Sequence, residues 1–427
     1  MKPTDTGIAR PRKAPADAGS LATPPEHSPD GAAPGPSAGR VLQVDVLRGF
    51  ALLGVLLVNA PVIAGAWNLG SQPGAAFTDR FATWLVAALF TSKFYLLFSF
   101  LFGYSFTLQM RAADQDGVPF AGRHGRRLVG LFLLGLAHAV LLYPGDILMT
   151  YAVLGLVLFA ARGLRTRTVL CGAALLILFL TAVFLAVGVV ALTLDNPGQD
   201  TTTAAVARDA AAYRGDPSSV VLTNIRMYRV ALGGAVLYSG HLLAAFLVGL
   251  AAGRHRLLDR RGGPARAVTK RLMVTGLLIG TPGSVFAAMC ACGPLDSRLY
   301  YVGQAADILT APALATAYGC ALLTLLQGRY GPWLHRILGP AGRMSLSNYL
   351  AQSLVLAAVF TGYGLGWYGR VGPAVLTGGC LVLYTLQLVV SAWLMARFRY
   401  GPAELLLRRV TGGWSGFSPA RRNVPTV

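Results

Sequence analysis

Two histidines and two aspartates fall near the same ends of long apolar segments in this 427-residue chain. His138 comes shortly before a Tyr-Pro-Gly-Asp turn that ends in Asp146, and His241 and Asp307 lie near the beginnings of two later apolar segments. A carboxylate that orients a histidine ring and stabilises its charged form produces a general base. We therefore predict that His138, Asp146 and His241 are catalytic and that Asp307 binds substrate.

The same four residues have two other interpretations. They could form hydrogen bonds between helices that fix the packing of a membrane bundle. They could also bind zinc, which histidine and aspartate ligate. No two of them have the helical spacing of a metal-ligand pair, so we predict no metal site.

A second group of polar residues lies toward the opposite ends of the apolar segments. Asp45 and Arg48 are three residues apart and share one face of a helix. They form either an ion pair that sets the depth of the helix or a charged site for an anionic group, such as the phosphates of an acyl carrier. Later in the chain, Ser345, Asn348 and Gln352 make a polar stripe on one helix face. The predicted substrate-binding residues are Asp45, Arg48, Asn59, Lys93, Asp307, Asn348 and Gln352.

Composition decides which kind of chain must position these groups. Hydrophobic residues make up 54% of the sequence and charged residues 13%, against about 25% charged residues in a soluble domain. The formal net charge is +20, but the arginines lie mostly between apolar segments, which indicates membrane orientation and not nucleic-acid binding. The sequence therefore predicts an all-α, polytopic transmembrane bundle of about ten helices, with the lipid bilayer as its partner.

Ten apolar segments are long enough, or nearly so, to cross a hydrocarbon core of about 30 Å at about 1.5 Å per residue. The stretch 77–110 is too long for one crossing and would bury Lys93, at a cost of several kcal/mol. We therefore predict a break near Lys93 that places this residue at the outer mouth, with 78–91 interfacial or re-entrant. The predicted spans are 41–66, 94–110, 126–143, 146–161, 168–194, 234–253, 270–290, 304–327, 343–361 and 373–396.

Lysine and arginine set the predicted orientation. Alternate connecting segments hold 28 of these residues on one side and 7 on the other, so the positive-inside rule places both termini in the cytoplasm. His124, in an arginine-rich inner loop, is predicted to be solvated, and 202–213 and 220–232 are predicted to be short surface helices. The predicted organisation is a disordered tail (1–39), an N-terminal transmembrane region (40–194), an extracytoplasmic loop (195–233), a C-terminal transmembrane domain (234–410) and a second tail (411–427).

Several ordered motifs resemble the YeiB family of bacterial membrane proteins, whose C-terminal domain has unknown function. The resemblance covers roughly residues 40–410 and includes that domain at 234–410. The motifs are Asp45-Val46-Leu47-Arg48-Gly49 with Val58-Asn59, Lys93 to Gly103, Gly135-Leu136-Ala137-His138 with Gly145-Asp146, Gly342-Arg343 to Gln352, and Phe398 to Glu404.

This family is similar to a wider group of transmembrane acyltransferases, which move an acyl group from cytosolic acyl-CoA to an acceptor on the far side. The resemblance implies acyl-CoA as co-substrate, a surface glycan or lipid as acceptor, no tightly bound cofactor and a plasma-membrane location. In those relatives the catalytic histidine lies at or just after the first span, where this chain has Asn59, Trp67 and Asn68. His138 would have to take that role. The alternative prediction is a proton-coupled transporter or exporter of a small or lipid-like molecule; the oligomeric state is left open.

Overall fold

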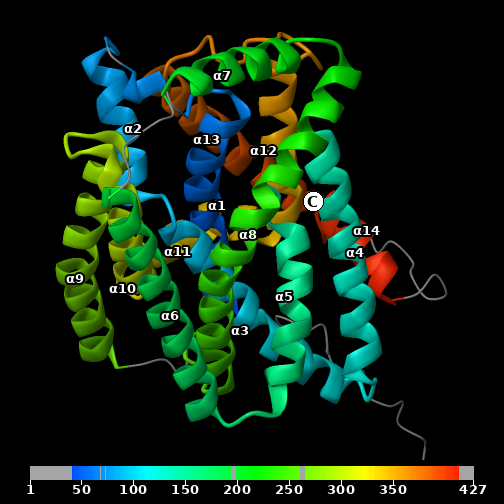
Figure 1. Cartoon of the computed structure of the whole chain (residues 1–427). Helices are drawn as coiled ribbons and strands as arrows, with labels where there is room; N and C mark the ends of the chain where they lie inside the picture. Colours follow the sequence, from blue (N-terminus) through cyan, green and yellow to red (C-terminus); the bar gives the residue numbers. More distant parts are fainter. Residues whose placement is uncertain (1–40, 68, 73, 194–198, 260–264, 413–427) are drawn as a thin grey trace, which may run out of the picture. The chain divides into compact units, whose positions relative to one another are not determined.

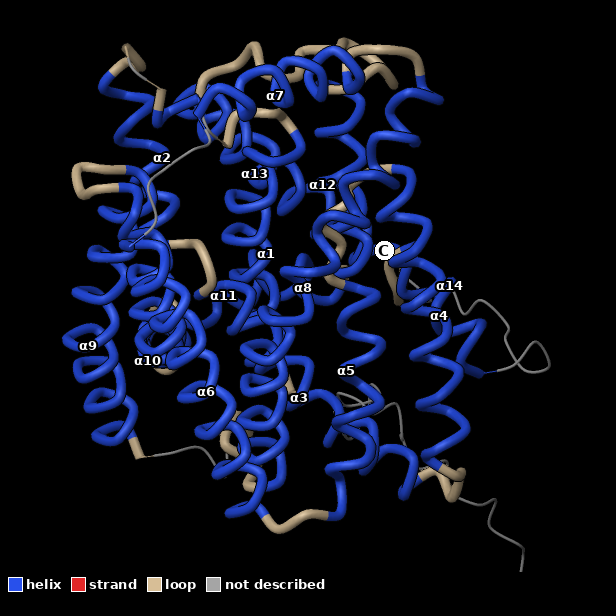
Figure 2. The backbone as a smooth tube through the Cα atoms, viewed as in Figure 1, coloured by secondary structure: helices blue, strands red, loops and turns tan. Residues whose placement is uncertain are grey.

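The computed structural model describes residues 41–67, 69–72, 74–193, 199–259 and 265–412. The predicted tail 1–39 lies outside these residues, as do Asn68 and the part of the predicted tail 411–427 that follows Gly412. In the described residues, helices are joined by turns and loops, and no strand occurs among them (Figure 2). The all-α prediction is confirmed.

Fourteen α-helices occur in the described part of the chain (Figure 1). They are α1 (Leu42–Ile63), α2 (Phe77–Leu89), α3 (Lys93–Gln115), α4 (Phe120–Leu141), α5 (Leu148–Ala160), α6 (Thr166–Thr193), α7 (Gln199–Tyr213), α8 (Pro217–Arg254), α9 (Arg266–Cys292), α10 (Tyr300–Leu326), α11 (Gly331–Arg343), α12 (Ser345–Phe360), α13 (Pro373–Arg397) and α14 (Pro402–Gly412).

Each of the ten predicted spans coincides with one helix: α1, α3, α4, α5, α6, α8, α9, α10, α12 and α13. Among the described residues, seven helical stretches are long and apolar enough to cross a membrane, and α5 and α12 are shorter apolar helices. The chain is therefore a multi-pass membrane protein. Its orientation remains a prediction from the distribution of lysine and arginine.

The predicted break near Lys93 is confirmed. Helix α2 ends at Leu89 and α3 begins at Lys93. Ser92, between them, has a φ of 67°, a left-handed conformation that interrupts a right-handed helix. Lys93 itself is 1% exposed and forms an ion pair with Asp307; its position at the outer mouth stays a prediction.

The segment 220–232 is not a separate surface helix. It belongs to α8, a continuous helix of 38 residues that also carries His241. The helix begins at an Asp216 cap: the Asp216 carboxylate accepts hydrogen bonds from the Ser218 hydroxyl and the Ser219 N–H, both 2.7 Å long, and these bonds lower the pKa of Asp216. No proline follows Pro217 within α8, and the helix continues through Gly233 and Gly234 into the predicted span.

His124 is buried, contrary to the prediction that it is solvated. Helix α4 begins at Phe120, before the predicted span, and its first turn packs the His124 ring among Phe106, Phe120 and Phe159. The ring is 2% exposed. The prediction rested on the arginines near His124 in sequence, but in the fold the ring packs against three aromatic side chains.

Helix α1 lies inside the bundle, whereas α6 and α13 lie at its surface. In the most apolar window of α1, 67% of the residues are buried, against 17% in α6 and 22% in α13. Both surface helices are apolar on their exposed sides, as lipid contact requires. A helix buried among other helices is the place where the polar residues Asp45, Arg48 and Asn59 can meet partners.

Candidate functional site

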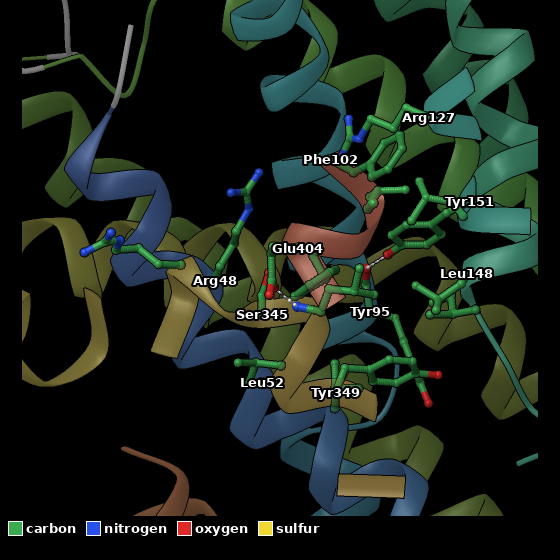
Figure 3. A pocket seen from close by; sticks show the side chains of 17 residues that line it. Arg48, Leu52, Tyr95, Phe102, Arg127, Leu148, Tyr151, Ser345, Tyr349 and Glu404 are labelled. Atoms are coloured by element: carbon green, nitrogen blue, oxygen red, sulfur yellow. Dashed lines mark hydrogen bonds between the residues drawn. The ribbon is translucent and has the colours of Figure 1, made fainter. Parts of the chain in front are cut away.

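A cavity of about 170 Å³ lies beside α1, between residues from α3, α4, α5, α12 and α14 (Figure 3). Its lining is mostly apolar, with Leu52, Val55 and Leu131 among the contacts. Three arginines and a glutamate line it, and so do three tyrosines, Tyr95, Tyr151 and Tyr349. An apolar cavity with a few convergent polar groups is the usual form of a small-molecule site.

The arginines of the cavity come from three helices. Arg48 on α1 donates to the Ser105 hydroxyl and lies 3.8 Å from the Asp45 carboxylate. Arg343, the last residue of α11, donates to the Arg399 carbonyl at 2.9 Å. Arg127 on α4 lies with its guanidinium carbon 5.4 Å from the centre of the Phe102 ring. The positive charges of Arg48 and Arg408 also act on Arg127, so like charges converge at this end of the cavity.

A glycine contact brings Arg48 and Arg343 together. A Cβ on Gly342 would collide with the Asp45 carbonyl of α1, and a Cβ on Gly49 would collide with the Leu338 carbonyl of α11. The two helix backbones therefore touch at positions where only glycine fits. Arg48 is the sequence neighbour of Gly49, and Arg343 is the sequence neighbour of Gly342. The contact between α1 and α11 therefore places the two arginines close together.

Glu404 is held at this end of the cavity by three hydrogen bonds from α12. Oε1 accepts the N–H groups of Leu346 at 2.8 Å and Ser347 at 3.2 Å, and Oε2 accepts the Ser347 hydroxyl at 2.5 Å. Glu404 thus caps the N-terminal end of α12, where a carboxylate interacts favourably with the helix dipole. It fixes α14 and α12 as walls of the cavity.

His138 and Asp146 form a buried pair. His138 Nδ1 lies 2.8 Å from Asp146 Oδ1, and the two side chains are 1% and 0% exposed. Asp146 Oδ2 accepts the Met149 N–H at 2.9 Å, which fixes the carboxylate at the beginning of α5. Because an ionised carboxylate only accepts, Nδ1 carries a proton, and in the neutral form of the ring Nε2 has the lone pair. Nε2 is buried and has no hydrogen-bond partner among the described residues.

Tyr349 connects the His138–Asp146 pair to the cavity. Its ring lines the cavity, and its centroid lies 5.0 Å from that of the His138 ring. Ile147, the residue after Asp146, is also part of the lining. Asn59 accepts hydrogen bonds from Tyr95 and, at 3.4 Å, from Tyr143, whose ring is in edge contact with His138. His138 is thus one side chain away from the cavity.

His241 and Asp307 belong to a different cluster. Lys93 Nζ donates to Asp307 Oδ1 over 2.6 Å, and His241 faces this pair from α8. None of the three lines the cavity. The structure therefore separates the four predicted His and Asp residues into two pairs instead of one group.

Asn348 and Gln352 also point away from the cavity, toward α13. Asn348 donates to the Ser391 hydroxyl at 2.9 Å, and Gln352 donates to the Gln387 side-chain carbonyl at 2.9 Å. Of the predicted stripe, Ser345 lines the cavity. The role of Asn348 and Gln352 in substrate binding stays a prediction, and their contacts are those of helix packing.

Sequence reasoning missed Arg127, Arg343, Tyr349 and Glu404 as site residues. Nothing in the sequence distinguishes Arg127 from Arg123 and Arg126, which are its neighbours in an arginine-rich segment. Arg343, Tyr349 and Glu404 lie inside the motifs quoted above, and membership of those motifs was the one signal that could have selected them. In the residues that the structure describes, no three His, Cys, Asp or Glu side chains gather closely enough to hold a metal ion.

The long apolar helices define a multi-pass membrane protein. Residues 252–413 match the model of a family described as a protein of unknown function, DUF418. The chain is 30% identical over 394 residues to the uncharacterized protein YxaH of Bacillus subtilis (strain 168), a match that covers 87% of this chain and 94% of that protein. It is 29% identical over 403 residues to the uncharacterized protein YeiB of Escherichia coli (strain K12), covering 87% and 96%.

A third relative is an uncharacterized 39.9 kDa protein of Bacillus acidopullulyticus, 26% identical over 389 residues that cover 87% of this chain and 94% of that protein. The chain therefore belongs to the DUF418 family and is homologous to YeiB and YxaH over most of its length, as the motifs predicted. The matched segment includes Arg343 and Glu404 of the cavity, whereas Arg48 and His138 precede its first residue.

Proposed function

We propose that this protein is a plasma-membrane acyltransferase, which moves an acyl group from cytosolic acyl-CoA to an acceptor at the outer face. One observation carries the proposal: a single cavity has three arginines in its lining and a buried histidine–aspartate pair in contact with its wall. The first feature suits an anionic donor, and the second suits a general base. The acceptor class, a surface glycan or lipid, rests on the resemblance to membrane acyltransferases.

The arginines would hold the phosphates of acyl-CoA. Guanidinium groups bind phosphate oxygens through charge-assisted, often bidentate hydrogen bonds. Arg127 suits this role best, because it forms no hydrogen bond or ion pair with any described residue and faces two other arginines. Like charges held together at a partly buried site lower their energy by binding an anion. The apolar part of the cavity, around Leu52 and Leu131, would take the acyl arm.

The chemistry assigned to His138 is base catalysis. Nε2 removes the proton from an acceptor hydroxyl or amine, and the acceptor atom forms a bond to the thioester carbonyl carbon. The carbon–sulfur bond then breaks, and the leaving thiolate takes the proton back from Nε2. Asp146 orients the ring through Nδ1 and stabilises its charged form during the step. The products are an acylated acceptor and free CoA thiol.

Tyr349 sets a condition on this mechanism. Because its ring lines the cavity and contacts His138, a substrate atom reaches Nε2 only when the Tyr349 side chain turns aside. A residue that gates access in this way also keeps water from the base in the empty protein.

Replacing Arg127 with Gln is expected to weaken acyl-CoA binding by about tenfold or more, since a hydrogen bond to a charged group contributes about 1.5–3 kcal/mol. Full-length protein in nanodiscs of phosphatidylcholine alone would be titrated with acyl-CoA and the dissociation constant measured. Arg126→Gln is the matched control. Arg126 is the neighbouring residue of α4, is exposed, and donates to the Thr411 carbonyl instead of lining the cavity. Equal loss of affinity in the two variants would mean that general surface charge, not the cavity, attracts the donor.

Replacing Gly135 with Ala is expected to lower acyl transfer by up to about 10²-fold, the cost of misplacing a catalytic group by about 1 Å. A Cβ at Gly135 would lie 2.6 Å from Asp146 Oδ2 and 2.6 Å from the Met149 backbone nitrogen, so the carboxylate that orients His138 must shift. Gly125→Ala on the same helix is the control, because its Cβ would meet nothing within 4 Å. Rates would be measured with labelled acyl-CoA in proteoliposomes, and unchanged transfer by the Gly135 variant would contradict the role of Asp146.

A proton-coupled transporter or exporter is the second candidate, and the buried Lys93–Asp307 pair beside His241 favours it. Ionisable groups inside a membrane often serve proton relays. Transport predicts movement of an unmodified solute that stops when the proton gradient is dissipated. Acyl transfer predicts a covalently modified acceptor and release of free CoA with no gradient present.

A further inference from the structure

A second set of ionisable side chains lies where α3, α8 and α10 pack together, away from the cavity. The Lys93 and Asp307 side chains are 1% and 6% exposed and are joined by a 2.6 Å hydrogen bond. His241, 4% exposed, faces both of them. Its Nε2 is buried and finds no hydrogen-bond partner in the described part of the chain. The group thus contains a balanced ion pair and a ring nitrogen without a partner.

Stability alone is a poor explanation for this cluster. Replacing a buried ion pair by well-packed apolar residues is often neutral or stabilising, because desolvation offsets most of the attraction. An intramembrane lysine, aspartate and histidine on three separate helices cost more than apolar residues that would fill the same space. The side chains are better explained by a task that needs their charges.

A line of polar side chains leads from the cluster to the surface. Tyr238 lies one turn before His241 on α8 and faces both Asp307 and Tyr300. Tyr300 begins α10, and Gln304 follows one turn later, three residues before Asp307. Tyr238 is 40% exposed and Tyr300 is 38% exposed. The Tyr238 hydroxyl therefore lies between the exposed beginning of α10 and the buried carboxylate.

We propose that Lys93, Asp307 and His241 form a proton-binding site, reached from the surface at Tyr238 and Tyr300. Without the added proton the site holds an ammonium, a carboxylate and a neutral imidazole, with no net charge. One proton from the water on that side binds to His241 Nε2, and the net charge becomes +1. The Asp307 carboxylate offsets part of the cost of this charge. The proposal is independent of the acyltransferase function.

Among the described residues, Lys93 and Asp307 are the charged groups that act on the His241 ring. Lys93 faces His241 from α3 and Asp307 faces it from α10, while Tyr238 precedes it on its own helix. Helix α6, which packs on both α8 and α10, carries Arg167 and Cys171 as its ionisable residues, both in its first two turns. A charged His241 competes with Lys93 for Asp307, so proton binding weakens the link between α3 and α10.

The test is a count of protons. Full-length protein in phosphatidylcholine nanodiscs would be titrated between about pH 8 and about pH 3, with empty nanodiscs subtracted, because burial makes the His241 ring harder to charge than a free imidazole. The unaltered protein is expected to bind about one proton per chain more than His241→Gln, since one imidazole takes up one proton. His255→Gln is the reference: His255 is exposed, so its replacement shows the size of a one-proton loss. A histidine that serves packing alone would stay neutral and remove no proton from the count.

A second comparison isolates the charge of Asp307. In an Asp307→Asn background, the further change His241→Gln is expected to remove no proton, because the carboxylate that offsets the added charge is gone. If His241→Gln elutes as aggregate on size exclusion, His241→Asn takes its place. Equal proton counts for the unaltered protein and a folded His241 variant would overturn the proposal, as would an unchanged loss of one proton in the Asp307→Asn background.

Discussion

Replacing His138 with Gln is expected to lower the rate of acyl transfer by about 10²–10⁴-fold, the usual contribution of a general base. Glutamine fills a similar volume but cannot take up a proton. The measurement is the transfer of labelled acyl groups from acyl-CoA to acceptor in proteoliposomes, with kcat and KM obtained separately. Because His138 is not a residue of the cavity lining, we expect the loss in kcat and little change in acyl-CoA affinity.

Asp146→Asn tests the partner of His138 separately. An asparagine side chain has one acceptor oxygen, so it can accept from His138 Nδ1 or from the Met149 N–H but not from both, and it carries no charge to stabilise the protonated ring. We expect a smaller fall in kcat than for His138→Gln. His255→Gln, at an exposed position beyond the C-terminal end of α8, should leave the rate unchanged. Wild-type rates in both His138→Gln and Asp146→Asn would remove this pair from the mechanism and leave helix packing as its role.

Replacing Asp307 with Leu is expected to lower the free energy of unfolding by about 3–5 kcal/mol, because the Lys93 ammonium is then buried without its partner. Lys93 is 1% exposed and its carboxylate partner lies 2.6 Å away, so water cannot take the place of the lost oxygen. Stability would be measured by denaturant unfolding of the full chain in detergent micelles. The double variant Lys93→Met with Asp307→Leu should recover most of the loss, since no charge then remains in the apolar contact.

The exposed pair of Arg123 and Asp116 gives the matched control. Its atoms lie 2.9 Å apart, but the side chains are 39% and 57% exposed, and such surface pairs contribute about 0–1 kcal/mol. Asp116→Leu should therefore change the unfolding free energy far less than Asp307→Leu. If Asp307→Leu lowers the free energy of unfolding as little as Asp116→Leu does, the Lys93–Asp307 pair is hydrated in the membrane. The premise of a buried ion pair is then wrong.

The proposed acyltransferase site combines residues that sequence reasoning found and residues that it missed. Arg48, His138 and Asp146 were identified because charged or titratable groups in apolar segments stand out at once. Arg127 was not identified, because the residues that face a cavity depend on how α4 packs and not on the local pattern. The same limit applies to Asn348 and Gln352, whose stripe is real but faces Ser391 and Gln387 on α13.

The sequence by itself determined the all-α class, the ten apolar segments that became helices and the break before Lys93, because apolar runs and helix-breaking positions are local properties. It also placed His138 and Asp146 close enough in the chain to pair across one turn. The tertiary structure alone decided that His241 and Asp307 join Lys93 instead of His138. It alone decided that Arg127 and Arg343 meet Arg48, and that the second half of the predicted extracytoplasmic loop belongs to α8. These outcomes depend on which helices lie side by side, and glycine contacts such as Gly49 with Leu338 and Gly342 with Asp45 set that arrangement between residues far apart in sequence.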